Sequence, residues 1–321
     1  MNRISIVIPM FDEARHIART LAAAREAAAQ AGLACELVVV DNGSHDQGPA
    51  LARALGARVL RLPGLSIGAL RNRGTASSQG EWLAFLDADV EVPAHWLVHL
   101  LRLHHEQRGD VFALACDTPS TAPWYAQAWQ RRTWRSGALQ AQERWLTSQN
   151  LLMRRCWFER VGGFDERLST GEDKDFTWRL TQAGARLTSV RAPAVVHWGF
   201  EGRWGEWLGK ELWRQGGHLR LLRQHAPSLR LWRFPLLALG AGACDLAALL
   251  TLVSGQPAPT LALLAVGALP ALALGIRQSL RQRDALLTLQ LCGLHWLRLR
   301  VAAGAVLLSL CNRYPRRPAR G

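Results

Sequence analysis

The chain has 321 residues, of which 49% are hydrophobic, so it is long enough for one large domain or two smaller ones with a sizeable core. Its net charge of +14 suggests anionic partners, namely nucleotides, nucleic acid or an anionic membrane surface. The six cysteines are scattered without C-x-x-C spacing, which argues against a zinc site and against a disulfide framework.

The first 90 residues alternate between short apolar runs and helix-forming stretches. Strands are expected at residues 4–9, 36–40, 58–60 and 82–87, and helices at residues 13–31, 49–55 and 66–78. This alternation predicts parallel pairing in an α/β doubly wound sheet, where ligands bind outside the carboxyl ends of the strands. Segments 9–13, 41–46 and 87–89 follow such strand ends, so we expect them to converge on one crevice.

The run that ends in Asp87 and Asp89 carries the most specific chemistry. Two carboxylates one residue apart at a strand end can bind Mg2+ or Mn2+ together with substrate phosphates. Such a tripeptide is also common as a solvated acidic turn, so its position beside the other strand-end loops decides between the two interpretations. The chain has no G-x-G-x-x-G after the first strand and no P-loop motif, which argues against a dinucleotide enzyme and a P-loop nucleotidase.

Further elements are expected in the second hundred residues. A helix is predicted at residues 93–107, a strand at 110–116, and an amphipathic helix opened by residues 171–175. Asp173 lies in the first turn of that helix. It either complements the helix dipole or faces the crevice as a general base.

Seven sequence blocks occur in a fixed order between residues 4 and 200. They are residues 6–13, 39–46, 68–74, 85–89, 150–155, 161–166 and 171–176. Together they resemble glycosyltransferase family 2, with Phe11 where the family more often has Tyr. The resemblance implies the GT-A fold, an α/β fold with a mostly parallel sheet flanked by helices. It also implies a metal-dependent enzyme that moves a sugar from a nucleotide-diphospho-sugar donor to an acceptor hydroxyl, with inversion.

The resemblance assigns roles to individual residues. Asp173 matches the general base, Asp89 the direct ligand of a divalent cation (Mn2+ or Mg2+), and His197 a histidine that closes the metal site in part of the fold. A lone histidine after an apolar strand can equally be structural. The expected nucleotide-sugar contacts are Pro9, Phe11, Glu13, Asp41, Arg71, Asp87 and Glu172.

From residue 231 onward the composition becomes apolar. Residues 234–253 and 258–276 are predicted to form a hairpin that crosses a bilayer core of about 30 Å, with its arginine-rich flanks on the cytoplasmic side. Residues 285–310 hold His295, Arg298 and Arg300 in mid-run, so we expect an interfacial helix there. A soluble helical bundle is the alternative for the whole region.

These expectations combine into one architecture. Residues 1–230 form a GT-A catalytic domain, with a nucleotide-sugar half at 1–110 and an acceptor half at 111–230, and residues 231–321 form a helical membrane-associated region. The catalytic domain is expected in the cytoplasm at the inner (plasma) membrane, acting on a lipid-linked or glycan acceptor of the cell envelope. Nucleic acid is not an expected partner, because no basic stripe with interleaved aromatics is present.

Two alternatives remain at this point. A nucleotidyltransferase of similar fold should carry a glycine-rich basic loop after the first strand, and this chain has Pro9-Met10-Phe11-Asp12-Glu13 there. A catalytically idle nucleotide-sugar-binding scaffold protein would not need Asp87, Asp89 and Asp173 together.

Overall fold

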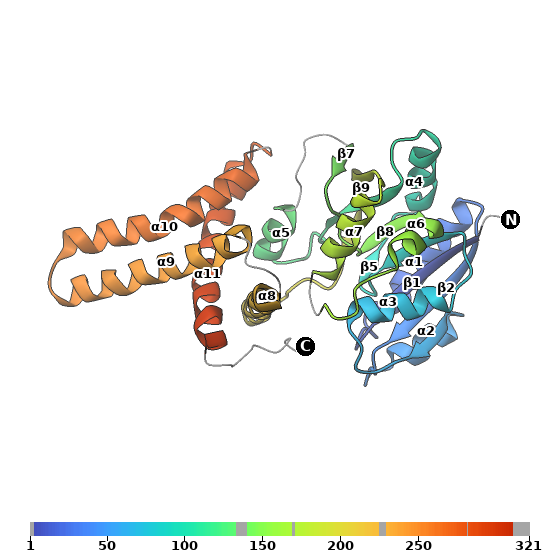
Figure 1. Cartoon of the computed structure of the whole chain (residues 1–321), viewed down its shortest axis with the longest axis horizontal. Coiled ribbons are helices and arrows are strands. Elements are labelled where there is room, and N and C mark those ends of the chain that lie inside the picture. The colour runs from blue at the N-terminus through green and yellow to red at the C-terminus, as the bar shows by residue number, and fades with distance from the viewer. Residues whose placement is uncertain (1–2, 133–139, 169–170, 225–228, 281, 311–321) are drawn as a thin grey trace. The chain divides into compact units, whose positions relative to one another are not determined.

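The computed structural model describes residues 3–132, 140–168, 171–224, 229–280 and 282–310 (Figure 1). The chain divides into two compact units. Unit 1 comprises Met1–Ser120 and Ala138–Phe200, and unit 2 comprises Thr121–Gly137 and Glu201–Gly321. The predicted functional boundary at residue 230 stays a prediction, since the units are divided by packing and place residues 201–230 with the apolar helices.

Unit 1 is built on a nine-stranded mixed sheet with the order β3-β2-β1-β4-β8-β6-β9-β5, to which β7 adds by pairing with β9. β1 to β4 pair in parallel, whereas β8 is antiparallel to both β4 and β6. The strands are β1 (Arg3–Met10), β2 (Ala34–Asp41), β3 (Arg58–Arg61), β4 (Trp82–Leu86), β5 (Val90–Glu91), β6 (Val111–Asp117), β7 (Gln140–Glu143), β8 (Asn150–Arg154) and β9 (Leu187–His197).

Helices cover both faces of this sheet, which explains why its central strands are apolar on both sides. Ile4, Ile6 and Ile8 of β1 belong to the core under one helical layer, and Val7 belongs to the core under the other. The first layer is α1 (Ile17–Gln30), α2 (Gly48–Ala54) and α4 (Trp96–His105), and the second is α3 (Ile67–Ala76), α6 (Arg155–Val161) and α7 (Glu172–Gln182). The predicted α/β class with a mostly parallel sheet is therefore confirmed.

The close approach of α3 to the sheet depends on Gly74. A Cβ atom at this position would lie 2.3 Å from Cγ1 of Val7, which is too short for any side chain. α3 therefore lies directly on β1. This close packing sets how far Arg71, one turn earlier on α3, lies from the sheet.

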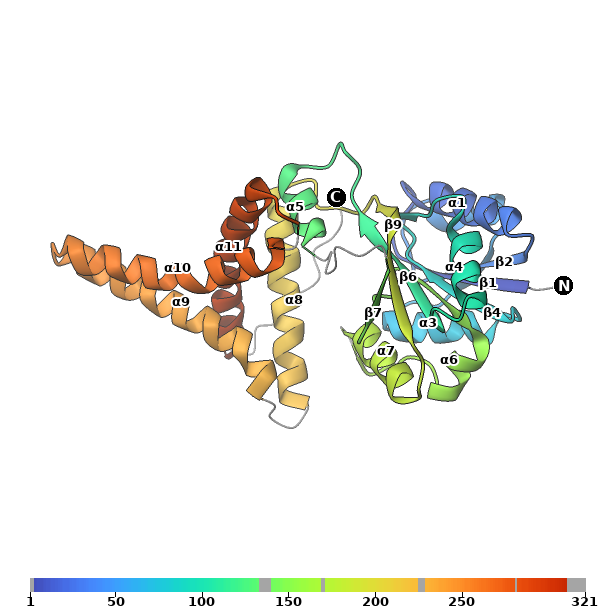
Figure 2. The same ribbon diagram turned by 90° about the horizontal axis from the view of Figure 1, so that it is seen from above.

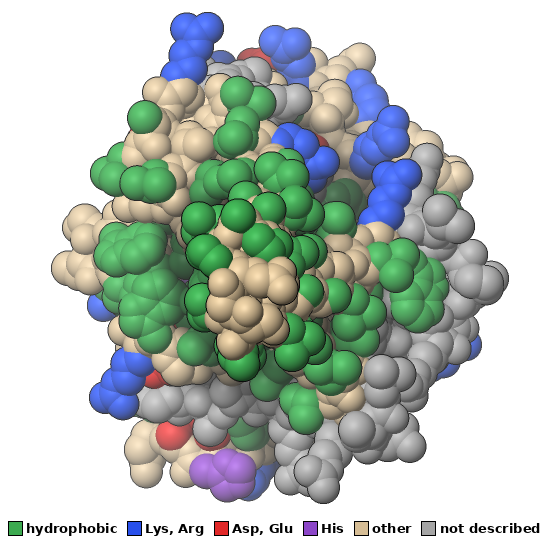
Figure 3. Space-filling view, turned by 90° about the vertical axis from the view of Figure 1, so that its left-hand side faces the viewer, with side chains coloured by type: hydrophobic (Ala, Val, Ile, Leu, Met, Phe, Trp, Pro, Cys, Tyr) green, Lys and Arg blue, Asp and Glu red, His purple; other side chains and the backbone are tan. Residues whose placement is uncertain are grey.

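Unit 2 contains α5 (Trp124–Arg131), α8 (Trp204–Gln224), α9 (Leu229–Val253), α10 (Pro257–Ser279) and α11 (Ala285–Leu310). Three segments are long and apolar enough to cross a membrane by length and composition: Trp232–Val253, Pro257–Ser279 and Ala285–Leu308. α9 and α10 form the expected hairpin. Figures 1 and 2 both show α11 running across the direction of this hairpin, and Figure 3 shows hydrophobic side chains gathered around the end of the hairpin that faces the viewer.

Packing distinguishes α11 from the other two apolar helices. Only 17% and 22% of the most apolar windows of α9 and α10 are buried inside the protein, compared with 44% for α11. The arginines of α11 also have partners: Arg300 binds Asp245 of α9 through two nitrogens at 2.8 and 2.7 Å, and Arg298 binds Glu211 of α8 at 3.1 Å. These pairs compensate charges that would be costly in an apolar helix.

Candidate active site

The loops that follow β1 and β2 are joined by three hydrogen bonds. The backbone N–H of Asp12 donates to Oγ of Ser44 at 2.9 Å, and that of His45 donates to Oδ1 of Asp12 at 2.7 Å. The N–H of Ala14 donates to Oδ2 of Asp46 at 2.7 Å. Asp12 has a φ of 53°, a left-handed conformation that aspartate tolerates better than most residues. The two loops therefore form one rigid edge beside the parallel strands.

This edge brings together the predicted nucleotide contacts Pro9, Phe11, Glu13 and Asp41. Asp41 ends β2 opposite Met10 in the strand register and is fully buried. Its Oδ1 accepts the N–H of Ser44 at 2.9 Å. Its Oδ2 has no hydrogen-bond donor among the described residues, and Nε of Arg61 lies 3.8 Å from it in an ion pair. The ring of Phe11 is 44% exposed next to this position, so the edge offers a buried acceptor and an accessible aromatic face.

Arg71 connects two of the predicted carboxylates. Its Nη2 lies 3.0 Å from Oδ1 of Asp87 at the end of β4, and its Nη1 lies 3.0 Å from Oε1 of Glu172 at the start of α7. Arg71 is only 2% exposed. Both terminal nitrogens thus already bind carboxylates, and a contact with a diphosphate would have to be shared with these ion pairs. The guanidinium aligns β4, α3 and α7.

Asp89 and His197 lie together, and both are near enough to Asp87 for their charges to act on it. Oδ2 of Asp89 is 3.3 Å from Nε2 of His197, and both side chains are largely buried. Two contacts produce this arrangement: His197 pairs with Val90 in the β5–β9 ladder, and the N–H of Trp198 donates to the carbonyl of Asp89 at 2.8 Å. The structure therefore places the two predicted metal ligands side by side.

Asp89 and His197 can bind a divalent cation only if the substrate supplies further ligands. Within the described residues, no group of three or more His, Cys, Asp or Glu side chains could hold a metal. Mg2+ and Mn2+ commonly use one or two protein carboxylates and complete their shell with waters and phosphate oxygens. One carboxylate and one imidazole match that requirement.

Asp173 occupies the first turn of α7, next to Glu172. Gly171 precedes it with a φ of 79°, and Oδ1 of Asp173 accepts the N–H of Lys174 at 2.8 Å. Burial, followed by the neighbouring charge of Glu172, raises the pKa of Asp173 to about 6. Burial also raises the pKa of Asp87, although Arg71 opposes this effect. Asp173 is therefore a stronger base than an ordinary aspartate.

The predicted residues form two groups along one edge of the sheet. The first is the loop edge after β1 and β2, and the second is a charged row from α7 through α3 to the ends of β4 and β9. β1 lies between β2 and β4 in the sheet, so both groups face the same side. The roles of these residues stay predictions. Ser44 and Asp46, which join the two loops, are not among the predicted site residues, although the sequence places their segment, 41–46, at the crevice.

The family model described as glycosyl transferase family 2 matches residues 5–164. The pre-mycofactocin glycosyltransferase of Mycobacterium tuberculosis is 27% identical over 272 residues, which cover 78% of this chain and 56% of that protein. The chain therefore spans little more than half the length of this relative. The succinoglycan biosynthesis protein ExoM of Rhizobium meliloti is 30% identical over 255 residues, covering 72% of this chain and 79% of that protein.

Among solved structures, the chain is similar to the mannosyltransferase PcManGT from Pyrobaculum calidifontis, in complex with GDP-Man and Mn2+. The TM-score is 0.58 at 17% identity, and the match covers 97% of this chain and 88% of that one. At this identity the likeness shows the GT-A fold alone.

Proposed function

The chain belongs to glycosyltransferase family 2, and from this premise we propose that it transfers a sugar from a nucleotide-diphospho-sugar to an acceptor hydroxyl. The observation that carries the proposal is the charged row Glu172–Arg71–Asp87, continued by Asp89 and His197, at the carboxyl ends of the strands. Such a row can bind the sugar donor together with a divalent cation and place both next to a general base.

Donor binding is assigned to both groups of residues. Oδ2 of Asp41, which accepts no hydrogen bond among the described residues, can accept an N–H from the nucleotide base, and the exposed ring of Phe11 can stack on that base. Asp89 and His197 would hold Mn2+ or Mg2+, which stabilises the charge of the departing diphosphate. The Mn2+ and GDP-Man in the PcManGT structure support this assignment. Arg71 is proposed to keep Asp87 and Glu172 oriented toward the donor.

Asp173 is proposed as the general base. With a pKa of about 6 it is deprotonated at neutral pH but still basic enough to take the proton of an attacking hydroxyl. Attack on the face opposite the departing diphosphate inverts the anomeric centre. Asp87 and Glu172 are ion-paired with Arg71, so neither carboxylate is available to take a proton. Asp173 is therefore the carboxylate that we assign as the base.

The membrane placement is a further part of the proposal. The α9–α10 hairpin crosses the bilayer of the inner membrane, and α11 lies along the interface because it runs across the hairpin (Figures 1 and 2). Arg277 and Arg283, after the second crossing, favour the cytoplasmic side for the catalytic domain. A lipid-linked or polysaccharide acceptor follows from this placement and from the role that ExoM's name gives it in succinoglycan biosynthesis.

A donor panel tests the activity. The purified full chain in detergent, with Mn2+ and a series of UDP- and GDP-sugars, should release nucleoside diphosphate, with the transferred sugar identified by mass spectrometry. Release of a sugar 1-phosphate, which is left when the nucleotidyl group and not the sugar is transferred, would point to a nucleotidyltransferase. Donor binding without any turnover across acceptors would point to an idle binding protein.

Three variants test the assigned roles. Asp89→Asn and His197→Gln should each weaken donor binding in the presence of Mn2+ but not in its absence. Asp173→Asn should bind the donor normally and lose transfer. Asp110→Asn is the matched control, because Asp110 precedes β6 at the amino end of that strand and pairs there with Arg186. Near-normal transfer by Asp173→Asn would remove that residue as the base.

A further inference from the structure

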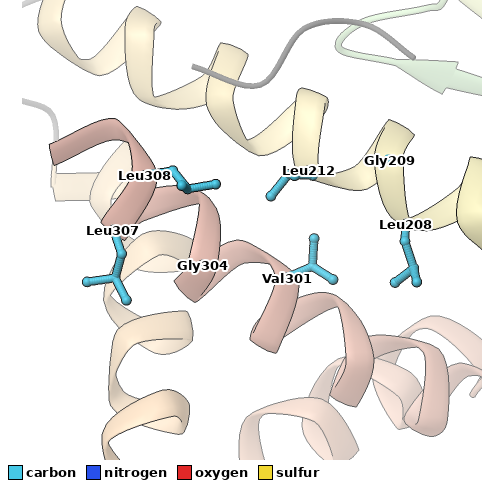
Figure 4. A pocket seen from close by; sticks show the side chains of 7 residues that line it. All are labelled: Leu208, Gly209, Leu212, Val301, Gly304, Leu307 and Leu308. Carbon is cyan, nitrogen blue, oxygen red and sulfur yellow. The ribbon is translucent and has the colours of Figure 1, made fainter. Parts of the chain in front are cut away.

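An apolar groove lies between α8 and α11 in unit 2 (Figure 4). Its volume is about 530 Å3, within the range of ~300–1,000 Å3 that is usual for ligand pockets. At two glycines the backbone itself lines the groove, and all the other lining side chains are aliphatic. The lining residues are Leu208, Gly209, Leu212, Val301, Gly304, Leu307 and Leu308.

A cluster of arginines lies about one helical turn from this groove. Arg298 precedes the groove residue Val301 on α11, and Glu211 adjoins Leu212 on α8. Glu211 is shared by Arg298, at 3.1 Å, and by Arg214. Arg132, after α5, stacks on Trp129 with its Cζ 3.9 Å from the ring centroid, and Arg298 approaches the same ring at 5.5 Å.

The positive charge of this cluster exceeds its negative charge. Arg214 and Arg298 share the carboxylate of Glu211, and Arg214 and Lys210 share that of Glu201. Arg132 makes no ion pair with any carboxylate in the described part of the chain. Burial and the charges of Arg214 and Arg298 lower the pKa of Arg132 to about 9. A buried guanidinium that is crowded by others is stabilised when an anion binds between them.

From these two features, we propose that unit 2 binds a phosphate-bearing membrane lipid, with its hydrocarbon chain in the α8–α11 groove and its phosphate on Arg132, Arg214 and Arg298. An amphiphile is the occupant that matches a hydrocarbon groove ending at a cluster with more cationic than anionic side chains. The groove also includes part of α11, one of the three apolar helices, so a chain can reach it from the bilayer. This inference does not depend on the transfer reaction.

The test uses two photoactivatable probes with the same diazirine-bearing alkyl chain. One ends in a phosphate and the other in an alcohol. The detergent-solubilised full chain is labelled with each, and the modified peptides are located by mass spectrometry. We expect labelling by the phosphate probe in residues 208–212 and 301–308, and about tenfold weaker labelling by the alcohol, because hydrogen bonds to charged groups are the stronger kind.

Two pairs of variants separate the groove from the cluster. Gly304→Leu fills the groove without a clash, since a Cβ at Gly304 meets nothing within 4 Å, and Gly293→Leu on the same helix is equally open but outside the groove. Labelling should fall about tenfold in Gly304→Leu and stay unchanged in Gly293→Leu. Arg132→Gln should remove the preference for the phosphate probe, whereas Arg203→Gln, at an exposed site, should keep it.

Three results would overturn the inference. The first is equal labelling of Gly304→Leu and the unmodified protein. The second is equal labelling by the phosphate and alcohol probes. The third is a dimer in light scattering that Gly304→Leu converts to a monomer while labelling is unchanged, because the groove would then be an interface between copies of the chain.

Discussion

Replacing Arg71 by methionine is expected to destabilise unit 1 by about 3–5 kcal/mol, the usual cost of removing one partner from a buried ion pair. Methionine keeps most of the side-chain volume, so the loss comes from charge and not from a cavity. Arg71 is 2% exposed and makes two ion pairs at 3.0 Å, to Asp87 and Glu172. Side-chain exposures of 24% for Asp87 and 11% for Glu172 leave little water to replace the guanidinium.

Thermal unfolding of the full chain in detergent measures this cost. One kcal/mol shifts Tm by about 2–4 °C in domains of this size, so a shift of roughly 10 °C is expected at neutral pH. The shift should shrink on acidification, because burial already raises the pKa of Asp87 and loss of Arg71 raises it further. Above that pKa the charge is unpaired in the variant, and below it the proton removes the penalty.

Arg73→Met is the matched control for this experiment. Arg73 lies on the same helix and also forms an ion pair at 3.0 Å, with Glu166, but it is 52% exposed. An exposed pair of this kind contributes about 0–1 kcal/mol. If Arg71→Met and Arg73→Met unfold at the same temperature, the ion pairs of Arg71 do not stabilise unit 1 as proposed.

Three further predictions follow from other parts of the structure. Transfer activity should rise with pH through about 6, the pKa of Asp173, and level off above it; a profile that is flat from pH 5 to 7 would exclude this base. Asp41→Asn keeps the acceptor for Ser44 but puts an amide in place of Oδ2, which accepts no hydrogen bond within the described part of the protein, so donor Kd should rise about tenfold or more in calorimetry; an unchanged Kd would show that Asp41 does not contact the nucleotide base. Asp245→Leu should lower Tm by leaving Arg300 unpaired, and adding Arg300→Leu should restore it; equal Tm values for all three proteins would contradict a structural role for the pair.

The parallel part of the sheet could be predicted because its signals are local. The apolar runs at β1, β2 and β4 stop at polar turns, and the strand ends then converge by topology. α1 illustrates the limit of such signals, since it begins at Ile17 and not at Glu13. The intervening residues form a turn in which Ala14 bonds to Asp46, a residue of another loop.

The remaining features depend on contacts between distant residues. β8 inserts antiparallel between β4 and β6, with Asn150 opposite Leu86, and no local pattern indicates that register. Arg71 was predicted as a donor contact, but its ion pairs join positions 71, 87 and 172 and could be found only in three dimensions. The proximity of Asp89 and His197 likewise depends on the pairing of β5 with β9.

The way in which distant helices pack together in unit 2 has a consequence for synthesis on the ribosome. Its core joins α5 and α8 to α11, which is made only after the whole hairpin. Trp129 packs on His295 with ring centroids 5.3 Å apart, and Glu211 binds Arg298. Domains generally fold as they emerge, N-terminal part first. α5 and α8 must therefore wait until α11 has left the ribosome, with an unfilled apolar face and with Glu211 paired to Arg214 but not yet to Arg298. Nascent chains halted before α11 should for this reason be the species that chaperones and proteases capture.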